Sequence, residues 1–444
     1  AVDVDDEGRL NGRVDIGCDE FWDSGATGAL SVTFVTPPPW RATTSSPLQL
    51  TGQIGGQALG YEWLWGDGQV TSNQFVVSHA YAFVGLYTVV LRAWNHDGEA
   101  SATGAVYVLD TVYVSPAGSG TLPYTNWAMA ATTIQDAVDF AHAGIKVLVT
   151  NGVYSTGGKA VYGAMTNRVA IWKPLTVRSV NGSGVTPIQG QGPLGNGAVR
   201  CVYLTNGAAL VGFTLTNGFT RTSGDALLER SGGGVWCESA NAVVSNCVIH
   251  GNSALMSGGG IYYGTFYKCT VRDNSGYWDG GGAYNGTLYN CTVGGNSAGR
   301  RGGGACYSTL YNCWVTGNAA TNGMSDACGG GAYYGTLYNC TVSSNLADNG
   351  GGVFQCSLSN SIVYYNTAIA ASNNHYGCTA TFTCTYSDPG GEGNITNEPG
   401  LMGLDNPHLV ASSPCIDAGT NEAWMAGAVD VDGEGRLIGH VDIV

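Results

Sequence analysis

The amino-acid sequence predicts an all-β chain in which a small β-sandwich precedes a parallel β-helix with a short capping helix. The β-helix is indicated by a repeated phrase, clearest as GGGAYNGTLYNCTVGGNSA over residues 280–298, which is too rich in glycine for an α-helix. An asparagine and a cysteine of this phrase recur about every 22 residues, a period typical of a solenoid. The sandwich is indicated by short strand-like runs between turn residues in residues 29–110.

The repeat defines the expected coil. Its recurring asparagine is found at Asn252, Asn274, Asn296, Asn318, Asn345 and Asn366, and its recurring cysteine at Cys247, Cys269, Cys291, Cys313 and Cys340. Such a coil is too short for a strand plus a crossover helix, but it has room for two or three short strands with tight bends. Residues 288–293 have a two-residue period, so Leu288 and Val293 are expected on opposite faces of one strand.

Stacking the coils at roughly 4.8 Å brings identical positions into ladders. We expect the asparagines to form one line along the axis, each amide bonding the neighbouring coil. An aliphatic interior stack is expected from Val271, Val293, Val315 and Val342. The coil between Asn318 and Asn345 is longer than the others, so residues 321–328 are expected to bulge outward.

Composition narrows the functional classes. The chain has 444 residues, of which 70 are glycine, and a net charge of −15, which argues against a nucleic-acid partner because no basic face is available. No apolar run approaches the ~18 residues of a membrane helix, so no membrane insertion is expected. No signal peptide is present, and the chain begins inside a motif, so it is interpreted as a mature or excised piece.

The 14 cysteines do not by themselves indicate a disulfide framework. Cysteines stacked in register point the same way, so the five in the repeat are expected to be unbridged apolar fillers. The best disulfide candidate is Cys356 with Cys378, while Cys18, Cys201 and Cys415 are too scattered to pair. The cysteines therefore do not determine whether the protein functions in an oxidising or a reducing compartment.

The two ends of the chain carry one phrase. Residues 1–16 read AVDVDDEGRLNGRVDI and residues 428–443 read AVDVDGEGRLIGHVDI, with 13 of 16 positions identical. Either this is a linker duplicated with a domain, or it is a head-to-tail junction in which one unit completes its neighbour. Both interpretations make the chain part of something longer.

The same phrase offers the only candidate metal ligands. Acidic residues alternate before a glycine, as at the start of a calcium loop, at Asp3, Asp5, Glu7, Asp430, Asp432 and Glu434. Valine stands at the twelfth position, at Val14 and Val441, where such a loop needs a bidentate acid. These residues are compatible with either a solvated acidic turn or a calcium site. No cofactor is required.

Residues 29–110 have the strand spacing of a small sandwich, with strands expected at residues 30–35, 48–52, 61–65, 75–80, 86–94 and 105–108. The motifs YEWLWGDG at residues 61–68, VSHAY at 77–81 and GLYTVVL at 85–91 resemble those of a PKD domain. The resemblance implies an immunoglobulin-like sandwich that serves extracellular proteins as a spacer or contact module. It implies a structural role for His79 and no catalytic residues.

A short amphipathic helix is expected at residues 132–141, capped by Thr132 or Thr133, before a first strand at residues 146–149. It would cover the open end of the solenoid. TIQDAVDFA at residues 133–141 and VLVTNGVY at 147–154 resemble the start of right-handed parallel β-helix proteins of the pectate-lyase-like type. SPCIDAG at residues 413–419, with the terminal phrase, resembles the ending of bacterial secreted β-helix proteins. The chain departs from that ending at Val444, but residues 14–20 preserve it.

The resemblance to polysaccharide lyases and hydrolases calls for carboxylates near a basic residue. Lys268, Arg272 and Asp273 form one cluster and Arg300 with Arg301 another, but neither has a carboxylate pair. The best candidates for a hydrolase dyad are Asp225, Glu229 and Glu238 in an irregular loop, where solvated carboxylates are equally expected. The recurring tyrosines either stiffen the solenoid as ladders or form an outward ridge suited to sugar stacking or protein contact.

These observations predict a junction segment at residues 1–28, a PKD-like sandwich at 29–110, a right-handed parallel β-helix at 111–410 and a closing segment at 411–444. The predicted function is a bacterial extracellular or cell-surface structural module that assembles end to end into a filament or surface layer, and not an enzyme. Its expected partner is another copy of itself, with residues 1–20 docking on the next unit's C-terminal β-helix end. A polysaccharide-binding adhesin, or a polysaccharide lyase or hydrolase acting on glycans, is the alternative.

Overall fold

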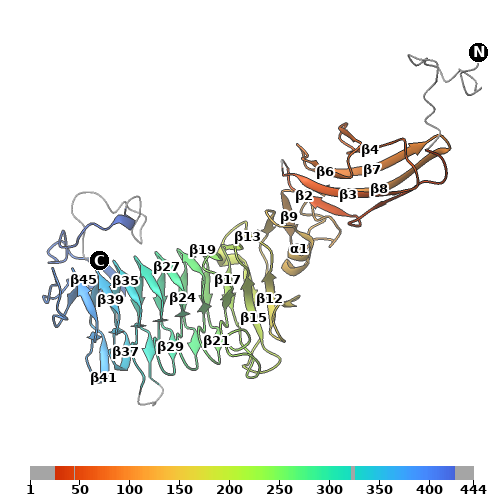
Figure 1. Cartoon of the computed structure of the whole chain (residues 1–444). Helices are drawn as coiled ribbons and strands as arrows, with labels where there is room; N and C mark the ends of the chain where they lie inside the picture. Colours follow the sequence, from red (N-terminus) through yellow and green to blue (C-terminus); the bar gives the residue numbers. More distant parts are fainter. Residues whose placement is uncertain (1–25, 45, 322–325, 426–444) are drawn as a thin grey trace, which may run out of the picture. The chain divides into compact units, whose positions relative to one another are not determined.

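A computed structural model of the chain describes residues 26–44, 46–321 and 326–425, and these residues form two units that divide between Asp110 and Thr111 (Figure 1). The first unit is a β-sandwich. One sheet has the order β2-β8-β7-β4-β5, with β2 Trp40–Ala42, β8 Gly98–Val108, β7 Gly85–Asn95, β4 Gly60–Leu64 and β5 Val70–Ser72. The other has the order β1-β3-β6, with β1 Ser31–Phe34, β3 Leu48–Gly55 and β6 Val76–His79.

The sandwich core is aromatic. Trp63, Trp65 and Tyr81 are fully buried between the sheets. The His79 ring stacks on Trp65 with centroids 4.6 Å apart, and its Nε2 lies 2.7 Å from a carboxylate oxygen of Asp67. These contacts place His79 in the packing of the sandwich. The six expected strands are present, but β8 begins seven residues earlier than expected, and the short strands β2 and β5 were not expected.

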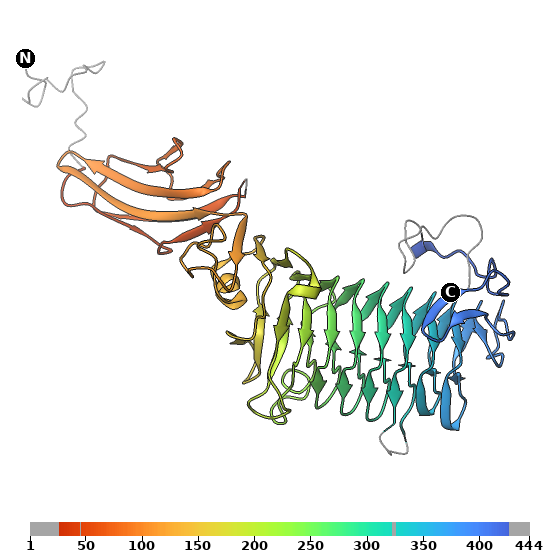
Figure 2. The same ribbon diagram turned by 180° about the vertical axis from the view of Figure 1, so that it is seen from behind.

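The second unit is a parallel β-helix built from four sheets (Figures 1 and 2). The eleven-stranded sheet runs from the N-terminal to the C-terminal end as β9 Thr111–Val114, β10 Lys146–Val149, β13 Thr176–Ser179, β16 Ala209–Val211, β19 Val243–Ser245, β23 Thr265–Tyr267, β27 Thr287–Tyr289, β31 Thr309–Tyr311, β35 Thr336–Tyr338, β39 Ser357–Ser359 and β43 Thr379–Thr381. The ten-stranded sheet contains β11 Lys159–Ala160, β12 Thr166–Ile171, β15 Val199–Leu204, β18 Val235–Cys237, β22 Ile261–Tyr262, β26 Ala283–Tyr284, β30 Ala305–Cys306, β34 Ala332–Tyr333, β38 Val353–Phe354 and β42 His375–Tyr376.

The two smaller sheets complete each coil. The nine-stranded sheet contains β14 Pro187–Gln189, β17 Thr214–Thr216, β20 Val248–His250, β24 Thr270–Arg272, β28 Thr292–Gly294, β32 Trp314–Thr316, β36 Thr341–Ser343, β40 Ile362–Tyr364 and β44 Cys384–Thr385. The six-stranded sheet contains β21 Ser253–Ala254, β25 Ser275–Gly276, β29 Ser297–Ala298, β33 Ala319–Ala320, β37 Leu346–Asn349 and β41 Thr367–Ala371. A hairpin of β45 Leu401–Gly403 and β46 Asn406–Leu409 follows. The predicted all-β class, a sandwich followed by a right-handed parallel β-helix, is confirmed.

Equivalent residues of successive coils pair in register. Val271 pairs with Val293, and both are fully buried, as are Val315 and Val342. The expected aliphatic stack is therefore confirmed as the inward-facing row of the nine-stranded sheet. The two-residue period is wrong across residues 288–293, because Asn290 has φ +53° and turns the chain between β27 and β28. Leu288 and Val293 consequently both face inward, since the left-handed residue resets which side points to the core.

The asparagines form the expected single line, between the nine- and six-stranded sheets. Asn274 donates from its backbone N–H and from Nδ2 to Oδ1 of Asn296, both at 3.0 Å, and Nδ2 also donates to the Ile249 carbonyl at 2.9 Å. Each later rung repeats the pattern to Asn366, which donates to Asn374. Each rung thus satisfies a buried amide and ties two coils together.

The line of asparagines explains why the repeat contains glycine triplets. A Cβ at Gly282 would lie 2.5 Å from the Gly304 carbonyl and 2.9 Å from the Asn296 amide, so only glycine fits beside the asparagine line. Half of the bulge expected at residues 321–328, residues 322–325, lies outside the part of the chain that the structure describes. The expectation is wrong for Cys328, which is buried and pairs with Arg301 and Asn349 of the adjacent coils.

The cysteines of the repeat are buried thiols without disulfides, as expected. The predicted disulfide between Cys356 and Cys378 is wrong. Both side chains occupy equivalent positions of adjacent coils, and the Cys356 N–H donates to the Cys378 sulfur at 3.3 Å. Parallel side chains one coil apart do not provide the crossed geometry of a disulfide. Cys18 lies outside the described residues.

Candidate functional site: the capped ends and outer faces of the β-helix

The N-terminal end of the β-helix is covered by α1, residues Ile134–Phe140, which packs on β9, β10 and β12. Thr133 is its N-cap, because its Oγ1 accepts the Asp136 N–H at 3.1 Å and donates to the Asp136 carboxylate at 2.7 Å. Ile134 and Val138 are buried against the first coils. The expected capping helix, with a threonine cap, is therefore confirmed.

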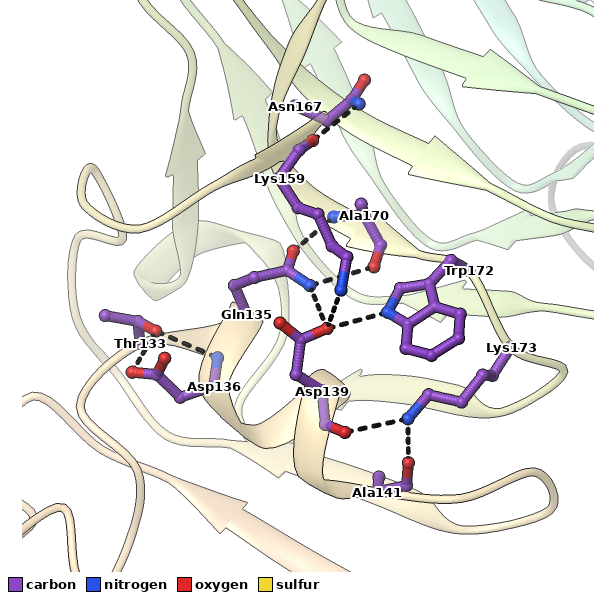
Figure 3. A network of polar contacts seen from close by, with 10 residues as sticks. All are labelled: Thr133, Gln135, Asp136, Asp139, Ala141, Lys159, Asn167, Ala170, Trp172 and Lys173. Carbon is purple, nitrogen blue, oxygen red and sulfur yellow. Dashed lines mark hydrogen bonds and ion pairs between the residues drawn. The ribbon is translucent and has the colours of Figure 1, made fainter. Parts of the chain in front are cut away.

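A polar network fixes the helix to the coils (Figure 3). The Gln135 amide pairs with the backbone of Ala170 in β12, accepting its N–H at 2.7 Å and donating to its carbonyl at 3.3 Å. One carboxylate oxygen of Asp139 accepts from Lys159 at 2.9 Å, Trp172 at 2.8 Å and Gln135 at 3.0 Å. The helix thus supplies hydrogen bonds that another strand would otherwise make.

Electrostatics strengthen this cap. Burial by itself would raise the pKa of Asp139, but hydrogen bonds from Lys159, Trp172 and Gln135 outweigh it and lower the pKa. Lys173 donates to the carbonyls of Asp139 and Ala141 at the end of the helix, where a cation is favourable. The ammonium groups of Lys159 and Lys173 lie 4.5 and 4.4 Å from the Trp172 ring centroid.

The C-terminal end is closed differently. Strands β41, β42, β43 and β44 are the last strands of their sheets, and no helix of the described residues covers them. Ile395 exchanges backbone hydrogen bonds with Thr383 and Thr385 at 2.9 Å, which covers β44, and Asn394 donates from Nδ2 to the Ala380 carbonyl of β43 at 3.2 Å. The edges of the other three sheets have no strand beyond them in the part of the chain that is described.

The described part of the predicted closing segment, residues 411–425, returns along the outer face of the eleven-stranded sheet. Asn360 and Thr420 exchange two hydrogen bonds of 2.8 and 2.9 Å, and Ser359 donates to Glu422. Trp424 then packs edge-on against Tyr311, with ring centroids 5.1 Å apart. The segment therefore binds the sides of earlier coils and also the last coil, where Cys415 packs in one cluster with Cys384 of β44.

Two aromatic rows line the outer faces. On the eleven-stranded sheet the rings stack at 4.7–4.9 Å along Tyr267, Tyr289, Tyr311 and Tyr338. On the ten-stranded sheet the row contains Tyr203, Trp236, Tyr262, Tyr284, Cys306, Tyr333, Phe354 and Tyr376. Most ring faces in these rows are occupied by a neighbouring ring. This arrangement favours ladder packing over sugar stacking, which needs a free ring face.

The three carboxylates suggested as a hydrolase dyad all accept hydrogen bonds, and Asp225 and Glu229 hold the loop around residues 221–231. Asp225 accepts the N–H groups of Leu227 and Leu228 at 2.8 Å, and these bonds lower its pKa. Glu229 accepts the Ala164 and Asp225 N–H groups at 2.7 and 2.8 Å, which lowers its pKa.

Glu238 accepts hydroxyl hydrogen bonds from Thr205, Tyr162 at 2.7 Å and Tyr203 at 3.0 Å, and these also lower its pKa. A glycosidase acid needs a raised pKa, so the described geometry gives none of the three carboxylates that role. Of the basic clusters expected from sequence, Arg272 pairs with Asp273 at 2.6 Å on the exposed face.

The structure assembles a charged cluster that sequence reasoning missed. Asp326 forms ion pairs with Arg300 and with Arg301, the latter at 3.6 Å, and Asp279 occupies the rung next to Arg301. Burial raises the pKa of Asp279. Arg301 also lies 5.2 Å from the Tyr333 ring, beside the aromatic row. The spacing of about one coil between Asp279 and Arg301 was the signal that could have revealed the cluster.

The six predicted calcium ligands, Asp3, Asp5, Glu7, Asp430, Asp432 and Glu434, lie outside the described residues. Within residues 26–44, 46–321 and 326–425, no group of three or more His, Cys, Asp or Glu side chains is arranged to hold a metal ion. No helix in the same ranges has the length and apolar character to cross a membrane.

Comparisons with known proteins found one family model and several solved structures that are similar to parts of the chain. Residues 32–108 match the family model described as "PKD domain". A solved structure of pectate lyase Pel9A is 15% identical, with 70% of this chain and 92% of that chain covered and a TM-score of 0.45. A rhamnogalacturonan lyase is 14% identical, with coverages of 73% and 94% and a TM-score of 0.37. No curated protein sequence matches. The chain thus combines a PKD domain with a parallel β-helix.

Proposed function

We propose that the chain is an extracellular structural module whose units assemble end to end into a filament or surface layer. The observation that carries this proposal is the difference between the two ends of the β-helix. The first coil is covered by α1 and its hydrogen bonds, whereas the last strands β41, β42 and β43 have no strand beyond them in the described chain. Exposed strand edges favour pairing with another chain.

The β-helix supports the structural part of the proposal. The asparagine line joins successive coils through two hydrogen bonds per rung, and the aromatic rows stack along the same axis. Ladders of this kind resist bending, because every coil must shift against its neighbours. A rod that is stiff along its axis suits an extracellular spacer, and PKD domains also serve as spacers.

The terminal phrase supports the assembly part. Residues 1–20 of one unit dock by strand addition on the C-terminal β-helix end of the next, where the edge strands lie. Because two different surfaces meet, this contact repeats without closing and produces an open filament. The PKD domain is then a spacer at each joint.

A second candidate is a polysaccharide-binding or polysaccharide-cleaving protein. The observation that favours it is the cluster of Asp279, Arg300, Arg301 and Asp326 beside the aromatic row. A carboxyl of raised pKa beside an ionised carboxylate and arginines is an arrangement that acid–base chemistry uses.

Assembly is tested with the full chain and with a variant lacking residues 1–20, by sedimentation velocity and negative-stain electron microscopy. The full chain should form filaments that lengthen with concentration, and the truncated chain should sediment as a monomer with an unchanged circular dichroism spectrum. A control carries Asn11→Ile and Arg13→His, the residues of the C-terminal copy of the phrase. Normal filaments from the truncated chain would refute the proposed junction.

A further inference from the structure

The last coil brings together two cysteines that are far apart in the repeat pattern. Cys384 belongs to β44, and Cys415 belongs to the closing segment, 31 residues later in the chain. Both side chains are fully buried and form one apolar cluster with Ile362. Both are present as thiols in the structure. Two buried cysteines in one packed cluster are candidates for a disulfide bond.

This pair differs from the cysteines that occupy equivalent positions of adjacent coils. Cys356 and Cys378 lie at the same position of adjacent coils, and the sulfur of Cys378 accepts the N–H of Cys356. The strands of those coils run parallel, so the Cα–Cβ bonds of such a pair also run parallel. Cys384 and Cys415 instead come from a strand and from an irregular segment that packs on it, so strand pairing does not hold their side chains parallel. A disulfide requires side chains that are free to converge.

We propose that Cys384 and Cys415 form a disulfide that fastens the closing segment to the last coil of the β-helix. The bond forms by exchange with a low-molecular-weight disulfide such as oxidised glutathione. The thiolate of one cysteine attacks that disulfide and releases one small thiol, and the thiolate of the other then attacks the mixed disulfide and releases the second. The two protein sulfurs are oxidised, the small disulfide is reduced to two thiols, and the two protein protons are taken up by those thiolates.

A disulfide between Cys384 and Cys415 would add a covalent anchor to a segment that is otherwise held by noncovalent contacts. The other described anchors of the closing segment on the β-helix are the Asn360–Thr420 and Ser359–Glu422 hydrogen bonds and the contact of Trp424 with the tyrosine row. The hydrogen bonds and the half-buried aromatic contact are noncovalent, so they can open and be replaced by contacts with water. A covalent bond at Cys415 closes a loop of about 30 residues and so limits the freedom of the detached segment.

Burial also determines when the bond forms. Both sulfurs are inaccessible to solvent once the segment has docked, so oxidation precedes or accompanies docking, and reduction requires the segment to detach. The inference rests on the extracellular location in the proposed function, because such bonds persist in oxidising compartments. It does not depend on filament formation.

The test uses the full chain refolded in a buffer of reduced and oxidised glutathione, then unfolded in guanidinium at acidic pH and alkylated with N-ethylmaleimide. The intact mass should show two unmodified cysteines among the 14. Cleavage beside Asp388 and Asp405 separates the two cysteines, so their peptides should stay joined until reductant is added. Complete alkylation of all cysteines after this treatment would overturn the proposal.

Cys356 and Cys378 remain in the same fragment as Cys384, so the joined peptides alone do not identify which cysteine of that fragment is bonded. Three variants identify it. Cys384→Ser and Cys415→Ser should each leave every remaining cysteine alkylated, whereas the matched control Cys356→Ser should still protect two. Protection that disappears in Cys356→Ser would assign the bond elsewhere and refute the proposal. The mass of the unmutated protein decides the question even if a variant fails to fold.

A second measurement follows the segment itself. Proteolysis within residues 411–425 should be at least about tenfold slower in the oxidised than in the reduced protein, because the disulfide keeps the detached segment near its site. Equal rates in the two forms would show that the bond does not fasten the segment. Filament formation is measured in parallel, so failure of the assembly proposal is distinguished from failure of this one.

Discussion

Trp424 packs edge-on against Tyr311, with ring centroids 5.1 Å apart, and thereby joins the closing segment to a coil more than a hundred residues earlier in the chain. Its indole Nε1 donates to Glu422 at 2.8 Å, while Glu422 accepts from Ser359. The aromatic contact and the hydrogen bonds therefore support one another on the outer face of the eleven-stranded sheet.

Trp424→Ala should weaken docking of the closing segment by about 1–3 kcal/mol, because the indole loses both its burial and its edge-on contact. Hydrogen exchange of residues 411–425 measures this effect. Trp127→Ala, which removes a more exposed indole packed on Tyr113, is the control and should leave exchange in this segment unchanged. If both variants exchange alike, the contact does not hold the segment.

Asn296→Ala should destabilise the β-helix by about 2–5 kcal/mol, since it leaves the Asn274 amide donors and the Val271 carbonyl without partners in a buried place. The midpoint of guanidinium unfolding measures the loss. Asn241→Ala, at an exposed position, should stay within about 0.5 kcal/mol of the unmutated protein. Similar midpoints for the two variants would contradict the role of the line.

Asp139→Asn should make the N-terminal cap less dependent on pH. The pKa of Asp139 is lowered in the folded protein, so its ionised form stabilises the fold above the unfolded value of 3.8, and that contribution is lost as pH falls through the folded pKa. The difference in Tm between the two proteins should therefore be largest above about pH 5 and shrink in more acid solution. Asp405→Asn, at an exposed site, is the control, and a constant difference across this range would refute the assignment.

No depolymerisation of acidic or neutral polysaccharides is expected from the purified chain, measured by release of reducing ends and of unsaturated products. The reason is that the Asp326 carboxylate is held in ion pairs with Arg300 and Arg301. It is therefore not available as the second reacting group that depolymerisation needs. Activity that Asp279→Asn and Asp326→Asn abolish, and that Asp225→Asn leaves intact, would instead establish the second candidate function.

Much of the β-helix could be predicted from the spacing of its residues. Asn274 and Asn296 stack because a repeat of one coil must superimpose equivalent positions, and their buried amides then have no better partner than each other. Thr133 could be predicted as a cap because the preference depends on the residues of one helical turn. Such features are local or periodic, and the sequence contains both kinds of information.

Other features depended on the path of the chain in three dimensions. The left-handed turn at Asn290 was hidden within a run that alternates like a strand, and it places Leu288 and Val293 on the same side. The meeting of Asp326 with Arg300 and Arg301 required knowing where the longer coil places Asp326.

The sequence by itself determined the period of the solenoid, the identity of its inward rows and the PKD motifs, because each is set by neighbours one turn or one coil away. Only the tertiary structure decided that Cys384 meets Cys415 and that Trp424 returns to Tyr311. The closing segment has no period, and its position is chosen by the buried surface and hydrogen bonds that the completed coils offer it. Those partners exist only once the β-helix has formed.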